Sequence, residues 1–254
     1  KTDKYYLVDN NTYKKILFHK YDNDFLEALI PYYQESKKFY VTRKFTYNSF
    51  MNIIRQICKS NIVMFNSSIK YNESKYNIDY LCPVKINSTE FISKSTAYEC
   101  DLFVSMSFNQ IFRNEIINVP KLGVINCHAG SLPFYRGRNI LNWALINDEK
   151  EFGITVHYVD EGIDTGDIIS QRCYPICDED DYGTLLKCAY GECANVLYDA
   201  IKDIQNDNVK VTVQNEIHPL GFYCVSRKEG DERLEWDQTS RTIFNFVRAI
   251  CEPG

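Results

Sequence analysis

The sequence lacks the two glycine-rich patterns by which proteins most often hold nucleotide phosphates. No Gly-x-Gly-x-x-Gly follows an apolar segment, and no Gly-Lys-Ser or Gly-Lys-Thr occurs in the 254 residues. The first pattern is typical of dinucleotide-binding proteins and the second of phosphate-loop proteins. Their absence argues against dinucleotide redox chemistry and against nucleotide hydrolysis.

Long apolar runs and a basic surplus are also missing. No stretch approaches the roughly 20 apolar residues of a membrane helix, and the first residues do not follow the basic-then-apolar plan of a signal peptide. The 29 basic and 34 acidic residues give a net charge of −5 at pH 7, which disfavours nucleic acid as a partner. We therefore expect a cytoplasmic protein that does not bind membranes and for which nucleic acid is a disfavoured partner.

The ten cysteines include no Cys-x-x-Cys pair. The closest pairs are Cys173 with Cys177 and Cys188 with Cys193, and neither has a histidine nearby in the sequence. A structural zinc site needs four ligands at short, regular spacing. We therefore predict reduced thiols and no metal site.

Apolar segments alternate with helical patterns along the chain. Strands are expected over residues 5–8, 39–41, 61–65, 102–106, 122–126, 153–160 and 167–173. Helices are expected over 50–57, 109–118 and 138–147, and from Asp181 or Thr184 to about residue 205. This alternation predicts an α/β fold with a Rossmann-like, doubly wound, mostly parallel sheet. We expect one domain over residues 1–205 and a short C-terminal extension, truncated, over 206–254.

Ligands of a doubly wound sheet bind at the carboxyl ends of its strands. Candidate catalytic residues are found at or after the ends of two of the expected strands. Asn126 closes one expected strand, His128 begins the loop after it, and Asp164 lies in a later loop between Gly162 and Gly166. Parallel strands should bring both loops to one edge of the sheet. An imidazole can accept a proton near neutral pH, and an amide can donate to a developing oxyanion. Spacing alone leaves open a turn with a hydrogen-bonded structural histidine.

The residues from Asp101 to Ile176 resemble the folate-dependent formyltransferases. The matching segments, in the order and spacing of that family, are Asn126-x-His128, Ser131-Leu132-Pro133-x-Tyr135-Arg136-Gly137, Gly153-x-Thr155-x-His157 and Asp164-x-Gly166-x-Ile168. Residues 233–250 resemble the segment that follows the catalytic domain in the tRNA and sugar branches. The resemblance implies that residues 1–205 form a formyltransferase catalytic domain.

The resemblance also implies a mechanism. A substrate primary amine would attack the formyl carbon of the co-substrate N10-formyltetrahydrofolate, with His128 as general base. The side-chain amide of Asn126 would stabilise the oxyanion. Asp164 would hold the imidazolium or relay the proton toward the departing folate nitrogen.

Seven further residues are binding candidates, some from the resemblance and some from the chemistry of their side chains. Those for the pterin are Gln110, Phe112 and the backbone around Ile163. Those for the acceptor are Tyr135, Arg136, Asn142 and Tyr223. An arginine can bind a diphosphate and an aromatic ring can stack on a sugar or base, but packing inside the protein is an open alternative for each. His157, in mid-strand, is predicted to be a buried structural histidine.

Departures from the family patterns favour one of its branches. Residues 5–11 contain no glycine, unlike the phosphate-binding turn of the ribonucleotide branch. The acidic balance and the end of the chain before a basic RNA-binding domain disfavour the tRNA branch. We expect the acceptor to be a nucleotide-linked amino sugar, a precursor of glycans or lipopolysaccharide. Methionyl-tRNA formyltransferase is the alternative enzyme, a folate- or nucleotide-binding module is the non-enzyme alternative, and a homodimer is left open.

Overall fold

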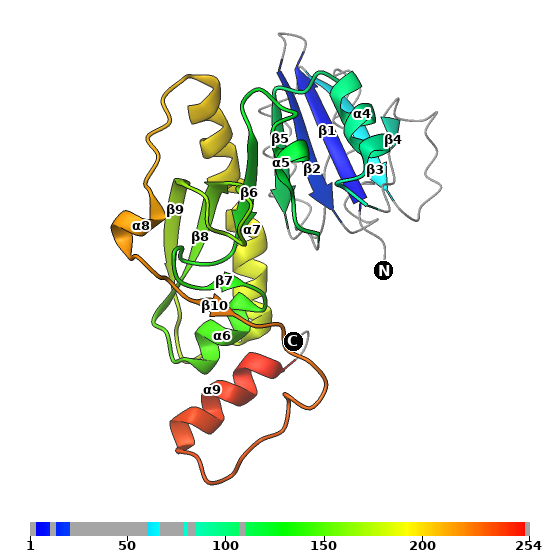
Figure 1. The fold of residues 1–254 in the computed structure, drawn as a ribbon. Coiled ribbons are helices and arrows are strands. Elements are labelled where there is room, and N and C mark those ends of the chain that lie inside the picture. The colour runs from blue at the N-terminus through cyan, green and yellow to red at the C-terminus, as the bar shows by residue number, and fades with distance from the viewer. Residues whose placement is uncertain are drawn as a thin grey trace. The chain divides into compact units, whose positions relative to one another are not determined.

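The computed structural model describes residues 4–10, 14–20, 60–66, 79–80, 85–106 and 110–251. The chain divides into two compact units (Figure 1). The first contains Lys1–Cys127 and His157–Gly162, and the second contains His128–Val156 and Ile163–Gly254. The strand expected over 39–41 and the helix expected over 50–57 lie outside the described residues. The predicted division at residue 205 stays a prediction.

The first unit contains a sheet with the strand order β4-β3-β1-β2-β5-β6. Its strands are β1 (Lys4–Asn10), β2 (Lys14–Lys20), β3 (Ser60–Asn66), β4 (Asp79–Tyr80), β5 (Leu102–Met106) and β6 (Val124–His128). Strand β1 runs antiparallel to β2 and β3, whereas the pairs β2–β5, β3–β4 and β5–β6 are parallel. The expected α/β fold with a mostly parallel sheet is confirmed.

Strand β6 begins two residues later than the sequence suggests. The N–H of Leu122 donates to the carbonyl of Asp101, and Gly123 adopts a φ of 77°, a left-handed conformation that suits glycine. The extended segment therefore starts at Val124 and ends at His128. The prediction that Asn126 closes the strand was wrong, and His128 belongs to the strand itself.

Two short helices complete the described part of the first unit. Helix α4 (Thr89–Ala97) is capped by the Ser88 side chain, which accepts from the Phe91 N–H. Helix α5 (Asn114–Ile117) is shorter than the helix expected over 109–118. It ends at Asn118, two residues before Pro120, which cannot continue a helix.

Among the described residues, the second unit carries the longer helices (Figure 1). Its elements are β7 (Arg136–Gly137), α6 (Ile140–Ile146), β8 (Glu151–Tyr158), β9 (Ile168–Pro175), α7 (Tyr182–Gln205), α8 (Gln214–Ile217), β10 (Tyr223–Cys224) and α9 (Ser240–Ile250). The last two residues of β8 belong to the first unit. Helix α7 begins after Asp181, one of the two expected starts, and Asp181 forms a capping box with Thr184. Helix α6 starts two residues late because Asn139 has a φ of 55°.

Helix α7 packs on β9 through an apolar stripe with helical spacing. The buried apolar residues of this helix are Leu185, Ala189, Cys193, Ala194, Val196, Leu197, Ala200, Ile201 and Ile204. On the strand side, Phe152, Ile154 and Val156 of β8 are buried. This core holds β8 and β9 in place, and the loop between these two strands carries Asp164.

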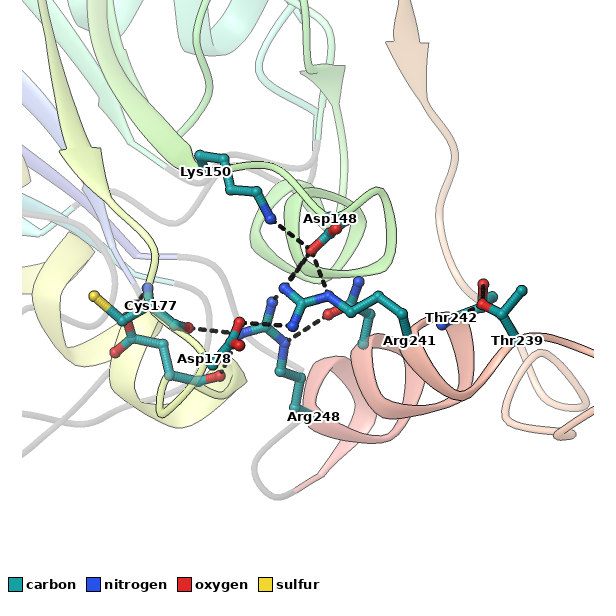
Figure 2. Close-up of polar contacts among 10 residues, drawn as sticks. Asp148, Lys150, Cys177, Asp178, Thr239, Arg241, Thr242 and Arg248 are labelled. Carbon is teal, nitrogen blue, oxygen red and sulfur yellow. Dashed lines mark hydrogen bonds and ion pairs between the residues drawn. The ribbon is translucent and has the colours of Figure 1, made fainter.

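Helix α9 is attached to α6 and to the start of α7 through polar side chains (Figure 2). The buried guanidinium of Arg248 donates to the carbonyl oxygens of Cys177 and Asp180, at 2.6 and 3.1 Å. Its Nε donates to Oδ1 of Asn245, which is only 1% exposed. The two bonds to carbonyl oxygens tie α9 to the segment before α7, and the bond to Asn245, within α9, holds the guanidinium in place.

Replacing Asp148 by asparagine is expected to lower the melting temperature near pH 7 and to remove part of its pH dependence. Hydrogen bonds from Arg241, and then from Lys150, hold the pKa of the Asp148 carboxyl well below its usual range (Figure 2). A carboxylate with a depressed folded-state pKa stabilises the fold above its unfolded pKa, near 4, and loses that contribution as the pH falls. The difference in melting temperature between variant and wild type should therefore shrink below about pH 4.

Calorimetric scans between pH 3 and pH 8 would measure this difference. Because the carboxylate is exposed, the effect should be modest and should decrease with added salt. A difference that is constant with pH would contradict the argument, since the asparagine then removes something other than a charge.

Candidate functional site

His128, at the end of β6, is buried and has two neighbours that define the roles of its ring nitrogens. Nε2 lies 2.7 Å from the carbonyl oxygen of Tyr135. A carbonyl can only accept, so Nε2 carries a proton and donates it. Nδ1 lies 3.6 Å from Oδ2 of Asp164. Nδ1 is therefore the nitrogen that can accept a proton, beside a carboxylate that would stabilise the resulting positive charge.

The carboxylate of Asp164 is held by the backbone of the Arg136-Gly137 segment. Oδ2 accepts from the N–H of Gly137 at 2.9 Å. Gly137 has a φ of 95°, and a Cβ on it would lie 2.4 Å from the carbonyl oxygen of Cys224, its partner in the parallel pair of β7 and β10. Only glycine fits this position, which accounts for the glycine in that motif.

Asn126 precedes His128 by two residues on β6, so both side chains project from the same side of that strand. Its Nδ2 lies 3.2 Å from Nε2 of His157, and Nδ1 of His157 lies 2.7 Å from the carbonyl oxygen of Tyr158. Nδ1 must donate to that carbonyl, so in the neutral ring Nε2 accepts from the amide of Asn126. His157 is buried as predicted and fixes which way the amide of Asn126 is turned.

The Gly153-x-Thr155-x-His157 motif lies along one side of β8 and holds the loop after β6. A Cβ on Gly153 would lie within 2.1 Å of Oγ of Ser131, so the loop packs directly on the backbone there. The Thr155 hydroxyl donates to the carbonyl of Gly130 at 2.6 Å. A period of two residues is the spacing at which side chains of a strand share a face. The spacing of Gly153 and Thr155 therefore places both residues on the side of β8 that contacts the loop.

Tyr135, predicted to contact the acceptor, is buried, and its hydroxyl donates to Oε1 of Glu149 at 2.6 Å. Asn147 donates to the same hydroxyl. Burial and the hydrogen bond to Glu149 raise the pKa of Tyr135 above its usual value. The hydroxyl therefore stays protonated at neutral pH.

The other three acceptor candidates lie in different surroundings. Arg136 is buried, and its guanidinium carbon lies 5.4 Å from the ring centre of Tyr223, which is about half exposed. Asn142 is buried in α6, and its Nδ2 donates to the carbonyl of Ala249. Arg136 and Tyr223 are thus neighbours, whereas Asn142 faces α9. The assignment of these residues to the acceptor stays a prediction.

The three pterin candidates belong to both units. In the first unit, Oε1 of Gln110 accepts from the N–H of Ile86 at 3.0 Å, and Phe112 is buried. In the second unit, Ile163 is 49% exposed. Their grouping around a pterin stays a prediction.

The described residues contain neither a metal cluster nor a disulfide. No group of three or more His, Cys, Asp or Glu side chains is placed to hold a metal ion within these ranges. The eight cysteines of the same part of the chain are not joined in disulfides. No helix in it is long and apolar enough to cross a membrane.

Gln214 is the residue near the candidate site that the sequence did not indicate. It is 2% exposed, and its Nε2 donates to the backbone carbonyls of Asp164 and Gly166. It lies 50 residues after Asp164 in a polar stretch without periodicity. No local pattern marks it, because its role depends on a contact between distant segments.

Comparison with known proteins decides the family. Residues 56–201, more than half of the chain, match the family described as formyl transferase. The chain belongs to this formyltransferase family. The resemblance seen in the motifs is thereby confirmed, and the four matching segments from Asn126 to Ile168 all fall within the matched region.

Individual relatives of this formyltransferase-family chain come from two branches. The methionyl-tRNA formyltransferase of Azobacteroides pseudotrichonymphae is 35% identical over 198 residues, which cover 74% of this chain and 59% of that protein. WlaRD, a sugar 3N-formyl transferase crystallised in the presence of dTDP and 5-N-formyl-THF, is 27% identical with a TM-score of 0.53, over 70% of this chain and 60% of that one. A 4-N formyltransferase from Francisella tularensis is 25% identical with a TM-score of 0.56, over 71% of both chains. The chain spans between half and three fifths of the length of the first curated relatives.

Proposed function

We propose that this chain transfers a formyl group from N10-formyltetrahydrofolate to a primary amine. The observation that carries the proposal is the His128–Asp164 pair, with Nδ1 of the imidazole 3.6 Å from a carboxylate that a backbone N–H holds in place. A base next to a fixed carboxylate serves a reaction that moves a proton, and simple ligand binding does not require it. The pair therefore favours an enzyme over a folate- or nucleotide-binding module.

The residues would act in sequence on one tetrahedral intermediate. As the amine nitrogen attacks the formyl carbon, Nδ1 of His128 accepts the proton that the nitrogen loses, and Asp164 stabilises the imidazolium. The amide of Asn126 donates to the oxygen of the former formyl carbonyl, which becomes negatively charged. When the bond from carbon to N10 breaks, the imidazolium returns the proton to N10, so that the base is neutral again.

We further propose that the amine belongs to a nucleotide-linked amino sugar, a precursor of glycans or lipopolysaccharide. The similarity to WlaRD and to the Francisella tularensis enzyme supports this acceptor, as does the acidic net charge of −5. The 35% identity to a methionyl-tRNA formyltransferase favours the second candidate, methionyl-tRNA. A cytoplasmic location is part of the proposal, and a homodimer is left open.

An acceptor panel would test both candidates. The protein would be incubated with formyltetrahydrofolate and, separately, with amino sugars linked to dTDP or UDP and with methionyl-tRNA, and the products analysed by mass spectrometry. We expect one formyl group to be gained by an amino sugar and none without the folate. Formylation of methionyl-tRNA alone, with a rate that falls steeply with salt, would establish the tRNA branch. Folate binding without formylation of any acceptor would contradict the enzyme assignment.

A further inference from the structure

Gln214, the first residue of α8, joins two segments that contact the candidate catalytic pair. Its Nε2 donates to the carbonyl oxygens of Asp164 and Gly166 at 2.9 and 2.7 Å. Its Oε1 accepts from Nε and Nη2 of Arg136 at 3.1 and 2.7 Å. The buried carboxamide thus makes two donor and two acceptor contacts, which is its full hydrogen-bonding capacity.

The orientation of this carboxamide is fixed by its partners. Turning it over would place its NH₂ against a guanidinium and its oxygen against two carbonyls, and every contact would become repulsive. Arg136 is itself held, because it is buried and its Nη1 donates to the carbonyl of Leu220. Gln214 is therefore a rigid bridge between β7 and the loop of Asp164.

The backbone of Asp164 needs such a bridge. Its φ of 55° is left-handed, a conformation that costs a residue other than glycine free energy and persists where the surroundings enforce it. Gln214 binds the carbonyl of Asp164 while the N–H of Gly137, next to Arg136, binds its carboxylate. The two ends of this residue are thus held from the same Arg136-Gly137 segment.

We propose that Gln214 is a positioning residue that holds the Asp164 carboxylate beside Nδ1 of His128. Without it, the turn over residues 164–166 loses two hydrogen bonds and Asp164 relaxes from its left-handed conformation. The carboxylate then leaves both the Gly137 N–H and the imidazole. The kinetic consequence rests on the proposed function, but the displacement of Asp164 does not.

Hydrogen exchange at the Gly137 amide measures this displacement without any assay of activity. Gln214→Ala is expected to speed exchange of this amide about tenfold, the effect of losing one hydrogen bond. Gln214→Glu keeps the size of the side chain and the acceptor for Arg136, but it turns a carboxylate oxygen toward the two carbonyls. It should therefore speed exchange of the Gly137 amide as well. This variant replaces Gln214→Ala in the experiment if the alanine variant does not fold. Asn245→Ala is the matched control, since Asn245 is equally buried and also accepts from an arginine Nε. Exchange at Gly137 that is unchanged in a folded Gln214 variant, or equally faster in Asn245→Ala, would overturn the proposal.

Turnover then tests the catalytic consequence. Gln214→Ala is expected to lower kcat about 10²-fold, as misplacement of a catalytic group by about 1 Å does, with KM values little changed. In an Asp164→Ala background the same substitution should cost nothing further, because Gln214 acts through Asp164. An equal loss in both backgrounds would overturn the positioning role. A wild-type protein that formylates no acceptor would refute the proposed function, while the exchange experiment would still decide whether Gln214 holds Asp164.

Discussion

His128→Gln is expected to lower kcat for formyl transfer by about 10²–10⁴-fold, the usual contribution of a general base. Glutamine is the sharpest replacement because its Nε2 can occupy the place of the imidazole Nε2 and still donate to the carbonyl of Tyr135. It has no counterpart of Nδ1, the nitrogen that faces Asp164, and an amide does not accept a proton near neutral pH. The variant therefore removes the base while leaving the contact that anchors this side chain. Steady-state turnover with the acceptor identified by the panel would measure the loss.

His218→Gln is a matched control for this substitution. Nδ1 of His218 accepts from the N–H groups of Leu220 and Gly221, and the residue has no place in the proposed machinery. It should turn over close to the wild-type rate. Both variants should bind the folate with wild-type affinity in a calorimetric titration. Wild-type turnover by His128→Gln would refute the role of the imidazole as a base.

The sequence was sufficient for the parts of the site that depend on short spacings. The shared strand of Asn126 and His128 was missed, because His128 was expected to begin a loop, but Gly153, Thr155 and His157 alternate along a strand that the sequence did predict. Residues at such spacings share a face whatever the rest of the fold does. The start of α7 near Asp181 was predicted on an equally local signal, and the structure adds the capping box between Asp181 and Thr184.

The end of β6 was misjudged because the turn before it is set by contacts that the sequence does not show. Leu122 is apolar and extends a run that looks like a strand, but its N–H is bound to Asp101 and the next residue, Gly123, takes a positive φ. Strand pairing can begin only after that turn. As a result His128 is the last residue of the strand.

Side chains that bridge distant segments were beyond the reach of the sequence. Gln214 meets Arg136 across 78 residues and Asp164 across 50. In the sequence, a glutamine and an arginine that bind a ligand look the same as a glutamine and an arginine that bind each other. Only the coordinates show that Arg136 and Gln214 form hydrogen bonds with each other. The same holds for Tyr135, whose hydroxyl contacts Glu149 inside the protein.

Asn126→Ala is expected to lower kcat by about 10²–10³-fold, the cost of losing one oxyanion donor, without changing the affinity for the folate. An oxyanion exists only in the transition state and the tetrahedral intermediate, so a donor aimed at it contributes little to ground-state binding. The measurements are steady-state turnover and a calorimetric folate titration of the same variant. A loss that appears in folate affinity and not in kcat would make Asn126 a binding residue instead.

His157→Asn tests whether activity depends on the orientation of the Asn126 amide, since this variant keeps the amide and removes the histidine beside it. The asparagine can still donate to the carbonyl of Tyr158, but it removes the ring nitrogen that lies 3.2 Å from the Asn126 amide. If that contact turns the amide toward the oxyanion, His157→Asn should lose part of the activity that Asn126→Ala loses, and the double variant should be no slower than Asn126→Ala alone. Additive losses would mean that the two residues act independently, and the amide would then owe its orientation to something other than this histidine.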